Sequence, residues 1–308
     1  MAQQTSSDLY ESLSVVRRLL GELEFPFHSA SAADTGRALD EVETLLDHYL
    51  LVRLKRMQAP LQVALAGATG SGKSTLVNAL AGQIVSSSGV LRPTTRMPVH
   101  VYHPADAVWF GGDYTVFDGR SAQGVPRGLS LLDTPSLDVA RGLSGSGAIE
   151  ALTGADAWLF VTTAARYADA VPWELLLQGA ERRVFVAVVI NRVPSGAVSE
   201  IRAHLGEMLA DRSLGEAPLF IVEECELDSS GMVPPEAIQP VADWVADLAA
   251  EEARRAAIMR TVDGAVDSVI WRVTKAVTEA DEDVFDEATR ADLLDAVGEV
   301  RGAWEARG

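Results

Sequence analysis

The sequence predicts an α/β fold: a mixed, mostly parallel sheet with helices on both faces, flanked by N- and C-terminal helices that form a helical bundle. In the middle of the chain, short apolar runs alternate with helical stretches, and at both ends apolar residues recur at helical spacing. We therefore expect an α/β domain at residues 59–234, between bundle helices at 1–58 and 235–308.

The terminal helices are predicted from their apolar stripes. Apolar residues recur at helical spacing from Leu9 to Leu20, from Val42 to Leu50 and, near-heptad, from Ile258 to Val277. Such stripes need a partner, so we expect the two ends of the chain to pair with each other. The acidic segment 276–308 reaches the last residue without a stop signal, and we expect the bundle to continue beyond it.

The central domain is predicted from apolar runs bounded by turn residues. The expected strands are Leu61–Ala66, Val99–Tyr102, Thr115–Phe117, Leu129–Leu132, Trp158–Val161, Val184–Ile190 and Leu219–Val222. Helical stretches separate several of them, at Lys73–Ala81, Trp173–Gly179 and Ser199–Leu209. This alternation is typical of a parallel sheet with crossover helices.

The composition limits the class of function. The 308 residues are 48% hydrophobic and 23% charged, with a formal net charge of −18 that opposes phosphate-rich polymers, so we expect no nucleic-acid partner. The single cysteine, Cys225, excludes an internal disulfide. Because there is also no signal-peptide or membrane-spanning pattern, we expect a cytoplasmic protein. Peripheral membrane association, through parts outside this chain, stays open.

A phosphate-binding motif follows the first predicted strand. Residues 67–75 satisfy G-x-x-x-x-G-K-[ST] between a strand and a helix. Glycines let successive N–H groups point inward, and the helix start adds its positive dipole end. Lys73 is predicted to reach the β- and γ-phosphates of a nucleotide, as a catalytic residue, and Ser74 to ligate Mg²⁺. The expected nucleotide-binding residues of this loop are Gly67, Thr69, Gly70, Ser71, Gly72, Lys73, Ser74 and Thr75.

An acidic residue for the metal ends another predicted strand. Leu129–Leu132 is an apolar run that leads directly into Asp133. A carboxylate at the end of a neighbouring strand is placed to hold Mg²⁺ through its hydration shell. Asp133 is therefore the second expected metal residue.

Four further segments complete a pattern. They are Arg92-Pro93-Thr94-Thr95-Arg96, Asp133-Thr134-Pro135-Ser136, Ala155–Val161 and Val189-Ile190-Asn191-Arg192. With the phosphate-binding loop, they resemble the translation-factor-related P-loop GTPases with Era-like and dynamin-like members, particularly the actinobacterial dynamin-like GTPases, over residues 60–225. The resemblance implies that Thr95 completes the Mg²⁺ shell and assists catalysis, and that Asn191 and Arg192 bind the nucleotide.

The resemblance also implies a function. It predicts a Mg²⁺-dependent GTPase that couples GTP binding and hydrolysis to homo- or heterodimerisation across the nucleotide face and to movement of the helical bundle. Ser136 replaces the family's glycine and Leu137 the water-orienting glutamine of small GTPases, so we expect slow hydrolysis in isolation. Pro194 replaces the guanine-binding aspartate, and Glu223-Glu224-Cys225 replaces the expected Ser-Ala, which leaves ATP open as a second nucleotide.

Two other functions stay open on the sequence. The altered residues also suit a nucleotide-binding module that hydrolyses little and acts through a partner. The loop itself suits ATP-using P-loop enzymes, and Leu143-Ser144-Gly145-Ser146-Gly147 loosely resembles the signature of an ATP-binding cassette. That signature precedes the metal-binding aspartate in cassettes, whereas here it follows Asp133, so the order argues against a cassette.

Overall fold

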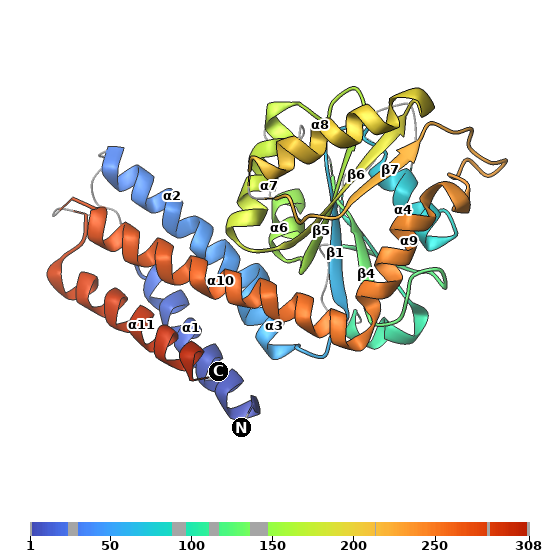
Figure 1. Ribbon diagram of the computed structural model, residues 1–308. Helices are drawn as coiled ribbons and strands as arrows, with labels where there is room; N and C mark the ends of the chain where they lie inside the picture. Colours follow the sequence, from blue (N-terminus) through green and yellow to red (C-terminus); the bar gives the residue numbers. More distant parts are fainter. Residues whose placement is uncertain are drawn as a thin grey trace. The chain divides into compact units, whose positions relative to one another are not determined.

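The computed structural model describes residues 2–23, 30–87, 97–110, 117–135, 147–212, 214–281 and 284–306. Contacts divide the chain into two compact units, both drawn in Figure 1. The sheet unit is Ala59–Thr261, and the helical unit combines Met1–Gln58 with Val262–Gly308.

The sheet unit contains one seven-stranded sheet with the order β3-β2-β4-β1-β5-β6-β7. The strands are β1 (Leu61–Ala66), β2 (Val99–Tyr102), β3 (Asp118–Ser121), β4 (Leu129–Asp133), β5 (Ala157–Thr163), β6 (Phe185–Val193) and β7 (Leu219–Glu223). Every neighbouring pair is parallel except β2 and β4, which are antiparallel. The predicted mixed, mostly parallel sheet is confirmed.

Helices cover both faces of this sheet. They are α4 (Lys73–Ala81), α6 (Gly147–Thr153), α7 (Ala170–Glu181), α8 (Val198–Ala210) and α9 (Pro235–Ala249), with short 3₁₀ segments η2 (Pro104–Trp109) and η3 (Ser195–Ala197). Helices α6, α7 and α8 share one apolar core with β1, β5 and β6, while α4 and α9 pack against each other on the other side (Figure 1). The central strand β1 is almost completely buried because it is covered from both sides.

One predicted strand lies mostly outside the described residues, and the edge strand of the sheet follows it. Thr115–Phe117 was expected to pair, but the edge strand is β3, Asp118–Ser121, which pairs in parallel with β2. Residues 115 and 116 lie outside the described residues, and Phe117 precedes the strand. Three of the four β3 residues are exposed, so an edge strand of this kind carries no apolar pattern that the sequence could reveal.

The sheet unit is longer at its C-terminal end than the expected domain. We predicted an end at residue 234, whereas α9 and the first turns of α10 (Glu251–Glu279) group with the sheet. In α9, Trp244 stacks on Phe185 of β6 with 6.0 Å between the ring centroids. In α10, the buried Thr261 hydroxyl donates a 2.8 Å hydrogen bond to the backbone oxygen of Asp156, just before β5.

The helical unit brings the two ends of the chain together. It contains α1 (Ala2–Gly21), α2 (Ala30–Leu45), the π-helical turn η1 (Leu46–Leu50), α3 (Leu51–Lys55), α10 from Val262 onward, and α11 (Glu287–Glu305). Helix α1 packs against α11, and the apolar stripes of α1 and α10 are buried. The predicted bundle of N- and C-terminal helices is confirmed. In the part of the chain that the structure describes, no helix has the length and apolar character needed to cross a membrane.

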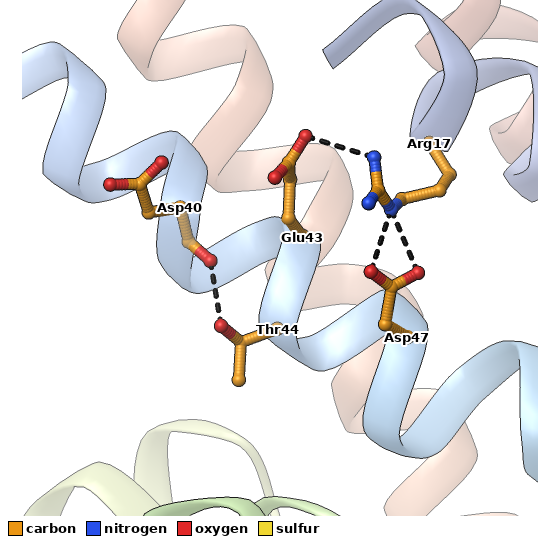
Figure 2. Close-up of polar contacts among 5 residues, drawn as sticks. All are labelled: Arg17, Asp40, Glu43, Thr44 and Asp47. Atoms are coloured by element: carbon orange, nitrogen blue, oxygen red, sulfur yellow. Dashed lines mark hydrogen bonds and ion pairs between the residues drawn. The ribbon is translucent and has the colours of Figure 1, made fainter. Parts of the chain in front are cut away.

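One arginine ties the N-terminal helices to one another. Figure 2 shows Arg17 of α1 between Glu43 of α2 and Asp47 of η1. Its Nε donates to both Asp47 oxygens, at 2.7 and 2.8 Å, and its NH1 donates to Glu43 Oε1 at 3.0 Å. The hydrogen bond to Asp47 raises the pKa of Arg17. Because all three side chains are partly exposed, each pair contributes at most about 1 kcal/mol, and the contact mainly fixes the register of the helices.

Candidate functional site

In the loop between β1 and α4, two glycines lie so close to neighbouring residues that no side chain would fit at either position. Gly67 has φ +151°, and a Cβ there would lie 2.1 Å from the backbone oxygen of Val161 in β5. Gly72 has φ +99°, and its Cβ would lie 2.2 Å from Asn191 Nδ2. Only glycine satisfies both the backbone angles and these contacts. The loop therefore folds as a backbone cradle at the carboxyl ends of β1 and β5, with α4 beginning immediately after Gly72.

The lysine of the loop is folded into the cradle. Lys73 begins α4 and is only 6% exposed. Its Nζ donates to the backbone oxygens of Gly67 at 2.8 Å and Ala68 at 3.2 Å. The hydroxyl of Ser71 is buried in the same loop, with no hydrogen-bond partner among the described residues. A positive charge, an unpartnered hydroxyl and a helix N-terminus thus converge on one small volume.

Asp133, the predicted metal residue, lies next to this cradle, close enough for the charge of Lys73 to act on its carboxyl group. It ends β4, where it pairs with Leu65 of β1, and it is completely buried. Burial raises the pKa of its carboxyl group, while the hydroxyls of Ser74 and Ser86 and the charge of Lys73 act in the opposite direction. Its Oδ2 accepts a 2.5 Å hydrogen bond from Ser86, whereas Oδ1 has no hydrogen-bond partner among the described residues.

These groups fit a magnesium ion. A buried carboxylate oxygen without a donor is costly unless a cation or an ordered water occupies the space beside it. The hydroxyl of Ser74 interacts with the same carboxylate and lowers its pKa. Hydroxyl and carboxylate oxygens are the hard ligands that Mg²⁺ prefers. Ser74 and Asp133 are thus the described residues that would hold the metal.

Asn191 connects the end of β6 to the cradle. Its Nδ2 donates to the backbone oxygen of Ser71 at 3.0 Å, and its Oδ1 accepts from Arg192 N at 2.9 Å. Arg192 is exposed and adopts φ +57° within β6, where the pairing with β7 shifts register between Ile190 and Val193. The backbone N–H of Glu224, just after β7, donates to the backbone oxygen of Val193, the last residue of β6, at 2.9 Å, so the ends of these two strands lie side by side. Pro194 is exposed there and immediately precedes η3.

Residues 62–192 match the model of the family described as 50S ribosome-binding GTPase. The match begins in β1, includes the phosphate-binding loop and Asp133, and ends at Arg192. This part of the chain is a P-loop GTPase domain. The predicted resemblance to P-loop GTPases is confirmed over these residues.

Comparison of the whole chain with known proteins adds the following likenesses. A chain of an oligomerised bacterial dynamin pair that senses and tethers membranes is 12% identical, with a TM-score of 0.48 and coverage of 90% of this chain and 56% of that one. Era, bound to MgGDPNP and 16S ribosomal RNA, is 21% identical, with a TM-score of 0.42 and coverage of 61% and 57%. Toc33 from Arabidopsis thaliana, with Mg²⁺ and GMPPNP, is 17% identical, with a TM-score of 0.38 and coverage of 76% and 93%.

The chain thus spans little more than half of the dynamin and Era chains. A search of curated proteins finds no match. The GTPase assignment rests on the family match and on the site itself.

Two features of the GTPase domain escaped the sequence analysis. Arg166, in the turn after β5, donates from NH1 to the backbone oxygen of Thr69 at 3.3 Å and from Nε to Asp169 at 2.8 Å, so an arginine touches the phosphate-binding loop. Ser86 reaches Asp133 from the segment after α4. Neither belongs to a motif, and only the folded chain brings them to the site.

Several predicted positions fall outside the described residues of the GTPase domain. They are Thr95 with the rest of Arg92–Arg96, together with Ser136, Leu137 and residues 143–146 of the Gly/Ser run, whose last residue, Gly147, begins α6. Thr134 is described and buried, and its hydroxyl donates to the backbone oxygen of Leu65 at 2.7 Å. The chain is therefore anchored to β1 immediately after Asp133.

Proposed function

We propose that this protein is a Mg²⁺-dependent GTPase that binds its nucleotide on the loop between β1 and α4. The observation that carries the proposal is the buried Oδ1 of Asp133, which has no hydrogen-bond partner among the described residues, together with the Ser74 hydroxyl and the Lys73 charge that act on the same carboxylate. Lysine, hydroxyl and carboxylate are the three groups that a P-loop uses to hold a metal-bound triphosphate. GTP as the nucleotide is supported by the family match.

Each residue of the site has a defined task in this proposal. The backbone N–H groups of residues 70–75 bind phosphate oxygens, aided by the dipole of α4. Lys73 exchanges its bonds to the Gly67 and Ala68 carbonyls for charged phosphate oxygens, which are stronger acceptors. Ser74 and Asp133 hold the metal, and by resemblance Thr95 completes its shell. When bound, Mg²⁺ offsets the negative charge on the phosphates.

We further propose slow hydrolysis in the isolated protein and a link to dimerisation. Leu137 carries no polar group to orient the attacking water, so the rate depends on a group supplied by dimerisation across the nucleotide face. Helix α10 belongs to the sheet unit up to Thr261 and to the helical unit from Val262 onward, which provides a continuous element for coupling the two. Sedimentation velocity with GDP and with a non-hydrolysable GTP analogue tests this: we expect a dimer with the analogue alone, and a monomer in both states contradicts it.

The location in the cell is also a proposal. We place the protein in the cytoplasm, with peripheral membrane association through parts outside this chain. Support comes from the family match and from an exposed, unpaired Cys225, which suits a reducing compartment. Fractionation of cells that produce the full-length protein tests it.

Phosphate release from GTP and ATP, with and without Mg²⁺, tests the activity. We expect Mg²⁺-dependent release from GTP, at least ten-fold slower in Lys73→Ala because a charge-assisted contact contributes about 1.5–3 kcal/mol. The matched control is Lys275→Ala, which removes a half-exposed lysine of the helical unit and should keep the parent rate. Tight GTP binding without phosphate release would favour the module that acts through a partner. Equal release from ATP would favour an ATP-using enzyme.

A further inference from the structure

A buried asparagine of α4 organises the chain segment that follows this helix. Asn78 is 2% exposed, and its Oδ1 accepts hydrogen bonds from the backbone N–H groups of Val85 and Ser86, both at 2.9 Å. Its Nδ2 donates to the backbone oxygen of Ser86, also at 2.9 Å. These three hydrogen bonds fix the backbone of residues 85 and 86, and two of them hold residue 86 on both sides of its Cα.

This anchoring delivers the Ser86 hydroxyl to Asp133. Ser86 is 3% exposed, and its Oγ donates to Asp133 Oδ2. The terminal torsion of an aspartate is broad, so a carboxylate without a fixed donor can rotate between orientations. With Oδ2 held by Ser86, Oδ1 is the oxygen left without a hydrogen-bond partner among the described residues. Ser74 and Lys73 of the cradle act on the same carboxylate.

We propose that Ser86 is a positioning residue for the metal site, and that Asn78 in turn positions Ser86. The hydroxyl holds Asp133 so that Oδ1 faces the Mg²⁺ that accompanies the nucleotide. This inference rests on the proposed function of the same site. Groups that orient a metal-binding carboxylate commonly contribute ten- to a hundred-fold in metal affinity, although they never touch the metal.

A purely structural role of Ser86 predicts a different result. If the hydroxyl only satisfies a buried carboxylate, its loss lowers the free energy of unfolding but leaves the metal dependence of nucleotide binding unchanged. The two roles are therefore separated by a Mg²⁺ titration and not by stability.

The experiment titrates a fluorescent GTP analogue in the presence of EDTA and at increasing Mg²⁺. Ser86→Ala should need at least about ten-fold more Mg²⁺ than the wild type for half of the gain in affinity, with unchanged affinity in EDTA. Ser86→Cys keeps the size of the side chain but donates weakly. It should behave like alanine, and it serves as the test protein if Ser86→Ala does not fold.

The matched control is Ser130→Ala. Ser130 lies in β4, the same strand as Asp133, and is fully buried, but its hydroxyl lies 2.9 Å from His100 Nε2. This variant should keep the parent Mg²⁺ dependence. A parent-like Mg²⁺ titration of Ser86→Ala or Ser86→Cys overturns the inference alone. A wild type that binds GTP without any response to Mg²⁺ overturns the inference together with the metal part of the proposed function.

Discussion

His100 makes the stability of the GTPase domain sensitive to acid. It lies in β2, packs against the rings of Tyr102, Phe110 and Phe117, and shares a 2.9 Å hydrogen bond with the Ser130 hydroxyl. Burial lowers its pKa from 6.5 to about 4. The unfolded chain takes up a proton near pH 6.5, whereas the folded chain does so only near pH 4, so stability falls as the pH falls through this window.

The size of the effect follows from the shift. A difference of about 2.5 pH units at about 1.36 kcal/mol per unit gives about 3 kcal/mol, of which about 2.5 kcal/mol is lost between pH 7.5 and pH 4.5. Burial raises the pKa of Asp133, so this group makes stability rise as the pH falls, opposite to His100. The wild type must therefore be compared with a variant of His100 that keeps Asp133, so that the contribution of Asp133 cancels. His100→Gln cannot be protonated and serves as that variant.

Denaturant unfolding at the two pH values measures the difference. We expect the wild type to lose about 2.5 kcal/mol more than His100→Gln on acidification. Equal losses in the two proteins would refute the conclusion that His100 is held neutral by burial.

Three further predictions concern the loop, the helices and the base. Gly72→Ala should weaken GTP binding more than about ten-fold, measured by titration, because its Cβ would collide with Asn191. The control Gly82→Ala has φ +66° and open space around the new Cβ, so it should keep the GTP affinity and lower the stability by only about 1 kcal/mol, measured by thermal melting. Without residues 1–58 the helical unit loses α1, α2 and α3, which should expose the apolar stripe of α10, so the shortened protein should aggregate or melt earlier. A monodisperse protein with the parent Tm would contradict this. The wild type should bind GTP more tightly than ATP by less than about a hundred-fold. Pro194→Asp should raise this ratio of affinities relative to Pro194→Ala, because an aspartate accepts two hydrogen bonds from guanine at about 1.5–3 kcal/mol each. Equal ratios in the two variants would show that this loop does not line the base.

The sequence predicts those parts of the site that depend on local pattern. The phosphate-binding loop, the helix that starts at Lys73 and the carboxylate that ends β4 each follow from neighbouring residues, and the structure brings Lys73 and Asp133 together because β1 and β4 are adjacent. The parallel sheet and the pairing of the terminal helices follow from apolar periodicity in the same way.

What the sequence does not predict depends on tertiary contacts. Asn78 and Ser86 are ordinary polar residues in the sequence, and their link to Asp133 spans 47 positions of the chain. Helix α9 is amphipathic whichever unit it joins. Its contacts with α4 and β7 and the stacking of Trp244 on Phe185 assign it to the sheet unit. The polar edge strand β3 is fixed by backbone pairing with β2, which leaves no apolar signature.

The Mg²⁺ dependence of GTP affinity in wild type and Asp133→Asn tests the central claim most directly. Isothermal titration with GTP in Mg²⁺ and in EDTA yields the gain in affinity that the metal provides in each protein. We predict a gain of at least about ten-fold in the wild type and little or none in Asp133→Asn, which keeps the size of the side chain but removes its charge. An undiminished gain in Asp133→Asn would contradict the assignment of this buried carboxylate to the metal.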